Sequence, residues 1–75
     1  MEVNGYKIEP GANLANADLG GAKLRGAKLR GATLNGATLA GANLAKADLT
    51  NAYFWNADLT NADLAGAKMP SASLN

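Results

Sequence analysis

Four cations stand close together near the start of the chain, in the stretch GAKLRGAKLRG at residues 21–31: Lys23, Arg25, Lys28 and Arg30. A cluster of lysine and arginine side chains can bind an anion or an acidic partner. The stretch GAKLRGAT at residues 26–33 has the glycine spacing of a phosphate-binding loop but lacks the Lys-Ser/Thr ending of such a loop. The alternative is that these charges only keep a small, otherwise apolar protein in solution.

A second candidate surface is the stretch AYFW at residues 52–55. Tyr53 and Trp55 flank Phe54, so an extended chain that buries Phe54 turns both neighbours outward. Exposed aromatic side chains are enriched at protein-binding surfaces. The alternative is that the two rings cover the core where the larger Phe54 side chain interrupts a series of leucines.

Other kinds of chemistry are excluded by composition. The chain contains no Cys and no His, which rules out disulfides, Cys/His zinc sites, thiol chemistry and Ser-His or Cys-His catalytic pairs. Asp18, Asp58 and Asp63 stand at repeat positions that place them on different faces or layers. Catalysis requires convergent groups in a concave site. We therefore expect no enzymatic activity, no catalytic residue, no cofactor and no metal.

Charge and hydropathy favour a cytoplasmic protein. Seven Lys/Arg and six Asp/Glu give a net charge of +1, which exerts no strong attraction on nucleic acid or an anionic membrane. No apolar run approaches the roughly 20 residues that span a bilayer. The start of the chain, MEVNGYKIEPG, lacks the basic and apolar regions of a secretory signal.

The dominant feature of the sequence is a five-residue repeat. Alanine occupies every fifth position from Ala12 to Ala72, and a large apolar residue follows two positions after each alanine. Thirteen consecutive A-x-L-x-x units therefore cover residues 12–75. Their central residues, which we expect to form the core, are Leu14, Leu19, Leu24, Leu29, Leu34, Leu39, Leu44, Leu49, Phe54, Leu59, Leu64, Met69 and Leu74.

A five-residue period fits neither a straight helix nor a straight strand. In a helix, five residues turn the side chain by roughly 500°, which spreads the leucines around the cylinder, and in a strand an odd period alternates them between faces. The residue two places after each central residue is usually Gly or Asn, from Asn16 to Ser71. These residue types form turns. One corner per unit closes a square after four units, so residue n stacks on residue n+20 at about 4.8 Å.

The repeat A-(D/N)-L-x-x, as in ANLANADLGGAKL, resembles the pentapeptide-repeat family over residues 12–75. The resemblance implies an all-β fold, a right-handed quadrilateral β-helix, here with about three coils. The segment YKIEPGANL is similar to the start of many small bacterial members, including those of cyanobacteria. Val3, Tyr6 and Ile8 stand outside the five-residue phase, so we expect residues 1–11 to form a cap over the first coil.

Stacking residue n on residue n+20 concentrates charge on particular faces. Asp18 and Asp58 share one face, whereas the four cations of residues 21–31 lie on two adjacent faces that each sum to +2. Lys28, Asp48 and Lys68 should form an alternating ladder of exposed ion pairs, each worth about 0–1 kcal/mol. Pro70, which has no N–H, should weaken the last strand edge as a template for further pairing.

The sequence favours a non-enzymatic structural or protein-interaction module with an unidentified protein partner. Its candidate partner surfaces are the residues Tyr53, Trp55, Lys23, Arg25, Lys28 and Arg30. The resemblance supplies an alternative, because some family members mimic B-form DNA and bind DNA gyrase. That mimicry implies a long, acidic rod, so the short length and basic faces disfavour it, and direct binding of nucleic acid is not expected.

The last units suggest a further interaction. Leu64, Met69 and Leu74 have no cap that would cover them, and repeat arrays need covered ends. We therefore expect end-to-end self-association through the C-terminal coil, or a longer array of which this chain is a part.

Overall fold

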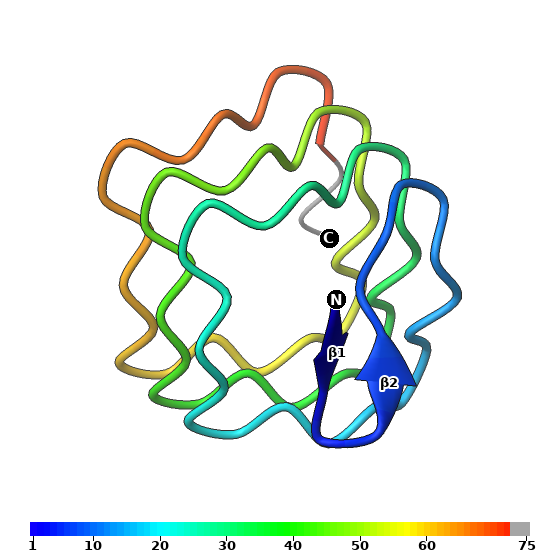
Figure 1. Cartoon of the computed structure of the whole chain (residues 1–75), viewed down its shortest axis with the longest axis vertical. Coiled ribbons are helices and arrows are strands. Elements are labelled where there is room, and N and C mark those ends of the chain that lie inside the picture. The colour runs from blue at the N-terminus through cyan, green and yellow to red at the C-terminus, as the bar shows by residue number, and fades with distance from the viewer. Residues whose placement is uncertain (73–75) are drawn as a thin grey trace.

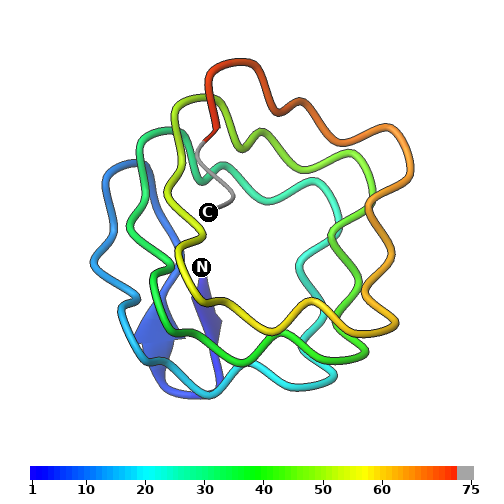
Figure 2. The same ribbon diagram turned by 180° about the vertical axis from the view of Figure 1, so that it is seen from behind.

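The chain winds into stacked layers with a twenty-residue period. The computed structural model describes residues 1–72. Parallel β-bridges join residue n to residue n+20, from Asn13–Thr33 at the start of the series to Asp48–Lys68 at its end. We name residues 12–31 the first layer, 32–51 the second layer and 52–71 the third layer. Figures 1 and 2 show the ribbon returning above itself in this register.

A corner with a positive φ angle follows at every fifth residue. All twelve positions that the repeat assigns to corners adopt this conformation: Asn16, Gly21, Gly26, Gly31, Gly36, Gly41, Lys46, Asn51, Asn56, Asn61, Gly66 and Ser71. Gly and Asn adopt it readily, whereas Lys46 and Ser71 accept a conformation that costs about 1–2 kcal/mol for an ordinary residue. The next N–H closes each turn, as where Ala17 N donates to Leu14 O at 3.1 Å.

Backbone hydrogen bonds tie each layer to the next. Leu14 N donates to Thr33 O at 2.7 Å, and Thr33 N donates back to Ala12 O at 2.9 Å. The corner residue adds a third bond, from Asn16 N to Asn35 O at 2.8 Å. The same three bonds recur around the layers, so each five-residue unit is held in register by its own backbone.

The position just after each central residue makes no such bond through its N–H. Pro70 occupies this position, and its C=O accepts the N–H of Asn51 at 3.0 Å like its equivalents in other units. The expectation that Pro70 weakens a strand edge is therefore wrong. Proline is accepted here because the ladder between layers does not use the N–H that proline lacks.

The space inside the layers is filled by the alanines and the central apolar residues. The central leucines of the first two layers and Phe54 are at most 2% exposed, with the alanines packed beside them. Leu59, Leu64 and Met69 in the third layer are only partly buried. Leu74 lies outside the described residues. The described residues bury no polar or charged side chain.

A short β-hairpin covers the first layer. Strand β1 (Glu2–Val3) pairs antiparallel with strand β2 (Tyr6–Lys7). The turn residues Asn4 and Gly5 have φ angles of 54° and 85°, the geometry that an Asn-Gly hairpin turn adopts. Val3 and Tyr6 pack against the core, and Ile8, just after the hairpin, is 5% exposed. The leucines of the first layer are therefore shielded from water.

The hairpin also satisfies part of the backbone edge of the first layer. Asp18 N donates to the Tyr6 hydroxyl at 3.2 Å, and the Asn4 side-chain amide donates to Asp18 O at 3.4 Å. In the second layer, the equivalent N–H and C=O of Thr38 bond to the first layer. Tyr6 and Asn4 thus replace, at this one position, the layer that would otherwise lie below.

Burial predicts different costs for removing leucines from different layers. The change Leu39→Ala in the second layer should lower the free energy of unfolding by about 2–5 kcal/mol, because a fully enclosed cavity forms. Leu59→Ala should cost less, since Leu59 is only partly buried. Urea denaturation of both variants measures the difference, and equal losses would contradict the layered core described above.

Candidate protein-interaction surface

The aromatic segment of residues 53–55 places one ring inside and two outside. Phe54 is 2% exposed, whereas Tyr53 is 51% and Trp55 is 56% exposed. These are the orientations that an extended strand gives to successive side chains. Tyr53 and Trp55 are, with Met1, the large apolar side chains among residues 1–72 that are most open to solvent.

The backbone that carries these rings is fixed to the second layer on both sides. Tyr53 N donates to Ala32 O at 3.0 Å, and Tyr53 O accepts the N–H of Leu34 at 2.7 Å. Trp55 N donates to the Asn35 side-chain oxygen at 2.8 Å, and Trp55 O accepts the N–H of Gly36. The two rings therefore project from a rigid base, and a partner would not have to order the backbone on binding.

The surroundings of the rings are polar but carry no charge. Tyr53 is bridged to Thr33, and Thr33 is bridged to Asn13 in the first layer. The units that contain these residues, 12–16, 32–36 and 52–56, hold no Asp, Glu, Lys or Arg. We call Tyr53, Trp55, Thr33 and Asn35 the aromatic face.

The cations of the first layer lie on a different part of the surface. Lys23, Arg25 and Lys28 are exposed, and the side chain of Arg30 is 63% exposed. Their layer also contains Asp18, whose backbone is hydrogen-bonded to side chains of the hairpin. We call Lys23, Arg25, Lys28 and Arg30 the basic segment.

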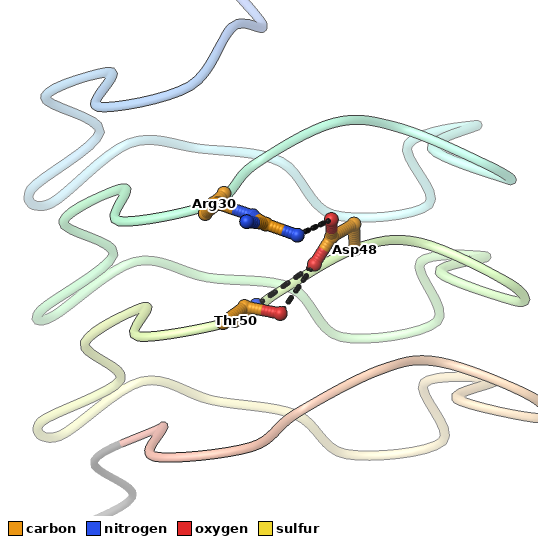
Figure 3. Close-up of polar contacts among 3 residues, drawn as sticks. All are labelled: Arg30, Asp48 and Thr50. Carbon is orange, nitrogen blue, oxygen red and sulfur yellow. Dashed lines mark hydrogen bonds and ion pairs between the residues drawn. The ribbon is translucent and has the colours of Figure 1, made fainter.

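One residue of the basic segment, Arg30, forms an ion pair with the carboxylate of Asp48. Arg30 Nη2 lies 3.1 Å from Asp48 Oδ2 in the layer above, and this is the ion pair found among residues 1–72. Figure 3 shows Asp48 between Arg30 on one side and Thr50 on the other. Because the pair is exposed to solvent, it stabilises the fold only weakly.

The predicted stacking of Lys28, Asp48 and Lys68 is confirmed, but the ion pairs expected along this ladder are wrong. Lys28, Asp48 and Lys68 are bridged in the predicted register, but neither lysine forms an ion pair with Asp48. Arg30 does so instead, from two residues further along the first layer. The oxygen Oδ1 of Asp48 is already bonded to Thr50, which leaves Oδ2 for a long guanidinium side chain.

Asp48 is strongly stabilised in its charged form. Hydrogen bonds from the hydroxyl and the backbone N–H of Thr50, together with the charge and hydrogen bond of Arg30, lower the pKa of Asp48 from 3.8 to about 2. In the third layer, the hydroxyl and N–H of Thr60 lower the pKa of Asp58 in the same way. Both carboxylates stay ionised at neutral pH, and their lowered pKa values make them weaker bases than an ordinary aspartate.

These bonds belong to a recurrent local motif that the sequence inspection missed. The side-chain oxygen of the Asp or Asn before a central leucine accepts the N–H two residues later, at the positions Asn13, Asp18, Asn43, Asp48, Asp58 and Asp63. This is the N–H that the ladder leaves unpaired. The preference for D or N in the repeat was the available signal, because short polar side chains bond to nearby backbone.

Residues 1–72 form no pocket and contain no cluster of three His, Cys, Asp or Glu side chains that could hold a metal ion. Nor does any helix among them have the length and hydropathy needed to cross a membrane. What these residues offer is an outer surface of exposed side chains.

The family model described as "Pentapeptide repeats (8 copies)" matches residues 11–44 and residues 39–75. The chain belongs to the pentapeptide-repeat family. Family membership and the structural match below assign it a right-handed β-helix, and pentapeptide-repeat proteins are generally non-enzymatic structural modules. No curated protein matches the chain significantly.

A solved pentapeptide-repeat protein has the same fold. The crystal structure of Rfr23, a pentapeptide-repeat protein from the cyanobacterium Cyanothece 51142, superimposes with a TM-score of 0.82 and is 38% identical in sequence. The match covers 84% of this pentapeptide-repeat chain but 44% of Rfr23. The chain therefore spans less than half the length of that relative.

The low pKa of Asp48 provides a test of the local motif. The change Thr50→Val removes the hydroxyl donor, so the pKa of Asp48 should rise toward 3.8, as followed by NMR titration of the carboxyl. Thr60→Val is the matched control, because it should raise the pKa of Asp58 and leave Asp48 unchanged. An Asp48 pKa that does not respond to Thr50→Val would contradict the assignment.

The lowered pKa of Asp48 also determines how the stability of the fold changes with pH. Because the pKa of Asp48 is lower in the folded chain than its ordinary value of 3.8, the ionised group stabilises the fold above that pH. This contribution disappears as the pH falls through about 2. In Thr50→Val, the loss of stability on acidification should therefore be smaller than in the wild type between these two pH values.

Proposed function

We propose that this chain is a non-enzymatic protein-interaction module of the cytoplasm, which presents side chains from the flat outer faces of its β-helix to a protein partner. In this proposal the helix is quadrilateral, with about three coils and one coil per layer. The four bridges per twenty residues and the corner at every fifth residue support that shape.

The observation that carries the proposal is the exposure of Tyr53 and Trp55. Each ring leaves more than half of its surface in water, although the neighbouring Phe54 is buried. Large aromatic side chains on a rigid base provide contact area at a low entropic cost on binding. Because the surrounding units hold no charged residue, a partner that covers the face avoids the larger cost of burying an unpaired charge.

The alternative of DNA mimicry toward DNA gyrase has less support. Mimicry of B-form DNA requires a surface dominated by negative charge, because the duplex carries one phosphate charge about every 1.7 Å along its axis. Here Lys23, Arg25 and Lys28 are exposed on the first layer, and the net charge of the chain is +1. The aromatic face has no counterpart in a phosphate backbone either.

A pull-down from the source cell extract tests the proposal. The double change Tyr53→Ala/Trp55→Ala should abolish recovery of the partner, because it removes the exposed rings without touching Phe54 or the backbone ladder. Thr38→Ala is the control, because Thr38 is exposed but lies outside the aromatic face. This variant should recover the partner as the wild type does. A partner recovered equally by the aromatic variant would contradict the proposal.

The third layer supports self-association as a second part of this function. Leu59, Leu64 and Met69 are partly exposed there, whereas their equivalents in the second layer are fully buried. Among the described residues, the N–H groups of these three residues also have no hydrogen-bond acceptor, unlike those of Leu39, Leu44 and Leu49. Two chains that meet through this end would bury both the apolar side chains and the open edge.

Sedimentation measures this association directly. The wild-type chain should form dimers at high micromolar concentration, and Leu64→Lys should shift it to the monomer because a charge would be buried at the interface. Lys68→Gln on the outer surface of the same layer should leave the dimer intact. A wild-type chain that stays monomeric would refute end-to-end pairing.

A further inference from the structure

The basic segment lies beside a strand edge that the N-terminal hairpin leaves open. On the side away from the second layer, the N–H groups of Lys23 and Lys28 and the C=O groups of Lys23, Arg25 and Lys28 have no hydrogen-bond partner among the described residues. Their equivalents in the second layer are all paired: Asn43 N donates to Ala22 O, and Asn43 O accepts the N–H of Leu24. The edge therefore has donors and acceptors in the pattern that a parallel strand would complete.

The hairpin does not extend over this part of the layer. Its hydrogen bonds to the layer go to Asp18, and the chain that follows it bonds to Arg30 O through Gly11 N. Between these two points lies the edge of residues 23–28. In Figure 1 the hairpin lies over one corner of the first layer, and the cyan-to-teal ribbon of residues 22–30 runs round the opposite side.

The chain itself shows which kind of strand fits this segment. On the other side of the same residues, the second layer lies parallel with Lys28 bridged to Asp48, and Asp48 forms the ion pair with Arg30 at 3.1 Å. Lys23, Arg25 and Lys28 form no ion pair among residues 1–72, so acidic residues of an added strand would supply the partner that Asp48 supplies to Arg30. Lys23 and Arg25, two residues apart on one strand, project about 6.4–6.8 Å apart, which equals the spacing of alternate side chains in an extended peptide.

We propose that the open edge of residues 23–28, with the basic segment beside it, binds an acidic segment of a partner protein by β-strand addition, with the added chain turning beside Gly26 as the layer itself does. In strand addition the backbone bonds supply affinity and the side chains supply selectivity. Carboxylates before the turn of the added chain would pair with Lys23 and Arg25 on one face of the layer, and carboxylates after the turn would pair with Lys28 and Arg30 on the next face.

Two other occupants fit less well. A second copy stacked in the same twenty-residue register would bring Asp58 next to Asp18 and Lys68 next to Lys28, and only Asp63 would meet an opposite charge, at Lys23. Single-stranded nucleic acid is usually held by aromatic rings interleaved with cations, and the first layer contains no aromatic residue. Lysine at an edge also discourages unspecific strand pairing, so a partner must offer the complementary charge.

This inference rests on the proposed role as an interaction module, but it uses a different surface from the aromatic face. The probe is a short synthetic peptide of alternating Glu and Thr with one central Gly for the turn beside Gly26, added to the isotope-labelled full chain. Exchange of the Lys23 and Lys28 amide protons with solvent should become slower, since strand addition gives both groups an acceptor. Peptides of alternating Lys and Thr should leave this exchange unchanged.

Variants separate the basic segment from charge in general. Lys23→Gln/Lys28→Gln should weaken binding of the acidic peptide by about five- to tenfold, as expected for two exposed ion pairs. Lys46→Gln/Lys68→Gln removes the same charge elsewhere and should change affinity less than twofold, within the range of a screened surface effect. Tyr53→Ala/Trp55→Ala should bind the peptide like the wild type, so failure of the aromatic face and failure of the open edge are observed separately.

Three outcomes would overturn the inference. The first is the absence of peptide binding, in which case the cations only guard the edge. The second is binding without slower exchange at Lys23 and Lys28, which would indicate adsorption by charge alone. The third is tighter binding of single-stranded oligothymidylate than of the acidic peptide, which would make this surface a nucleic-acid site.

Discussion

The positive φ angle at every fifth residue is the constraint on which this structure depends. It turns the chain by the same amount after each short extended segment, so the path closes after twenty residues and residue n lies over residue n+20. Every hydrogen bond between layers depends on this stacking. For example, Leu14 N donates to Thr33 O, and Thr33 N donates to Ala12 O. A slip of one residue would turn the central leucines outward, so the hydrophobic interior and the backbone ladder enforce the same register.

A second constraint acts on the polar residue before each leucine. The ladder uses three of the N–H groups near each corner and leaves one unpaired, and the Asp or Asn side chain supplies its acceptor. Carboxylates that suggest chemistry in the sequence are thus held by the backbone, and Asp48 and Asp58 have lowered pKa values as a result. The exposed side chains without such a role are chiefly the lysines, the arginines, Tyr53 and Trp55.

The two sides of the stack differ in how their backbone is satisfied. Below the first layer, residues of the hairpin pack against the core. The Tyr6 hydroxyl accepts the backbone N–H of Asp18, and the Asn4 amide donates to the Asp18 backbone C=O. The hairpin leaves the edge of residues 23–28 open and bordered by cations. Above the third layer, apolar side chains and backbone N–H groups are both more exposed than in the layer below. The two associations proposed above are therefore chemically distinct, one electrostatic and polar, the other largely hydrophobic.

The sequence by itself determined the period, the corners, the identity of the central residues and the outward direction of Tyr53 and Trp55. A strict repeat makes these properties local, because each unit of five residues carries its own turn residue and its own core residue. Even Lys46 and Ser71, which are poor corner residues, were placed correctly by their phase alone. The function of the surface was not encoded in this way, since outward side chains are free to vary.

Only the tertiary structure decided the contacts that depend on the exact reach of a side chain across layers. The ion pair of Asp48 goes to Arg30 and not to Lys28, because Thr50 fixes the carboxylate and the longer guanidinium reaches its free oxygen. The bonds of Tyr6 and Asn4 to Asp18 join a segment outside the repeat to a residue within it, so no period could reveal them. The tolerance of Pro70 likewise became clear only when the ladder showed which N–H each unit leaves unused.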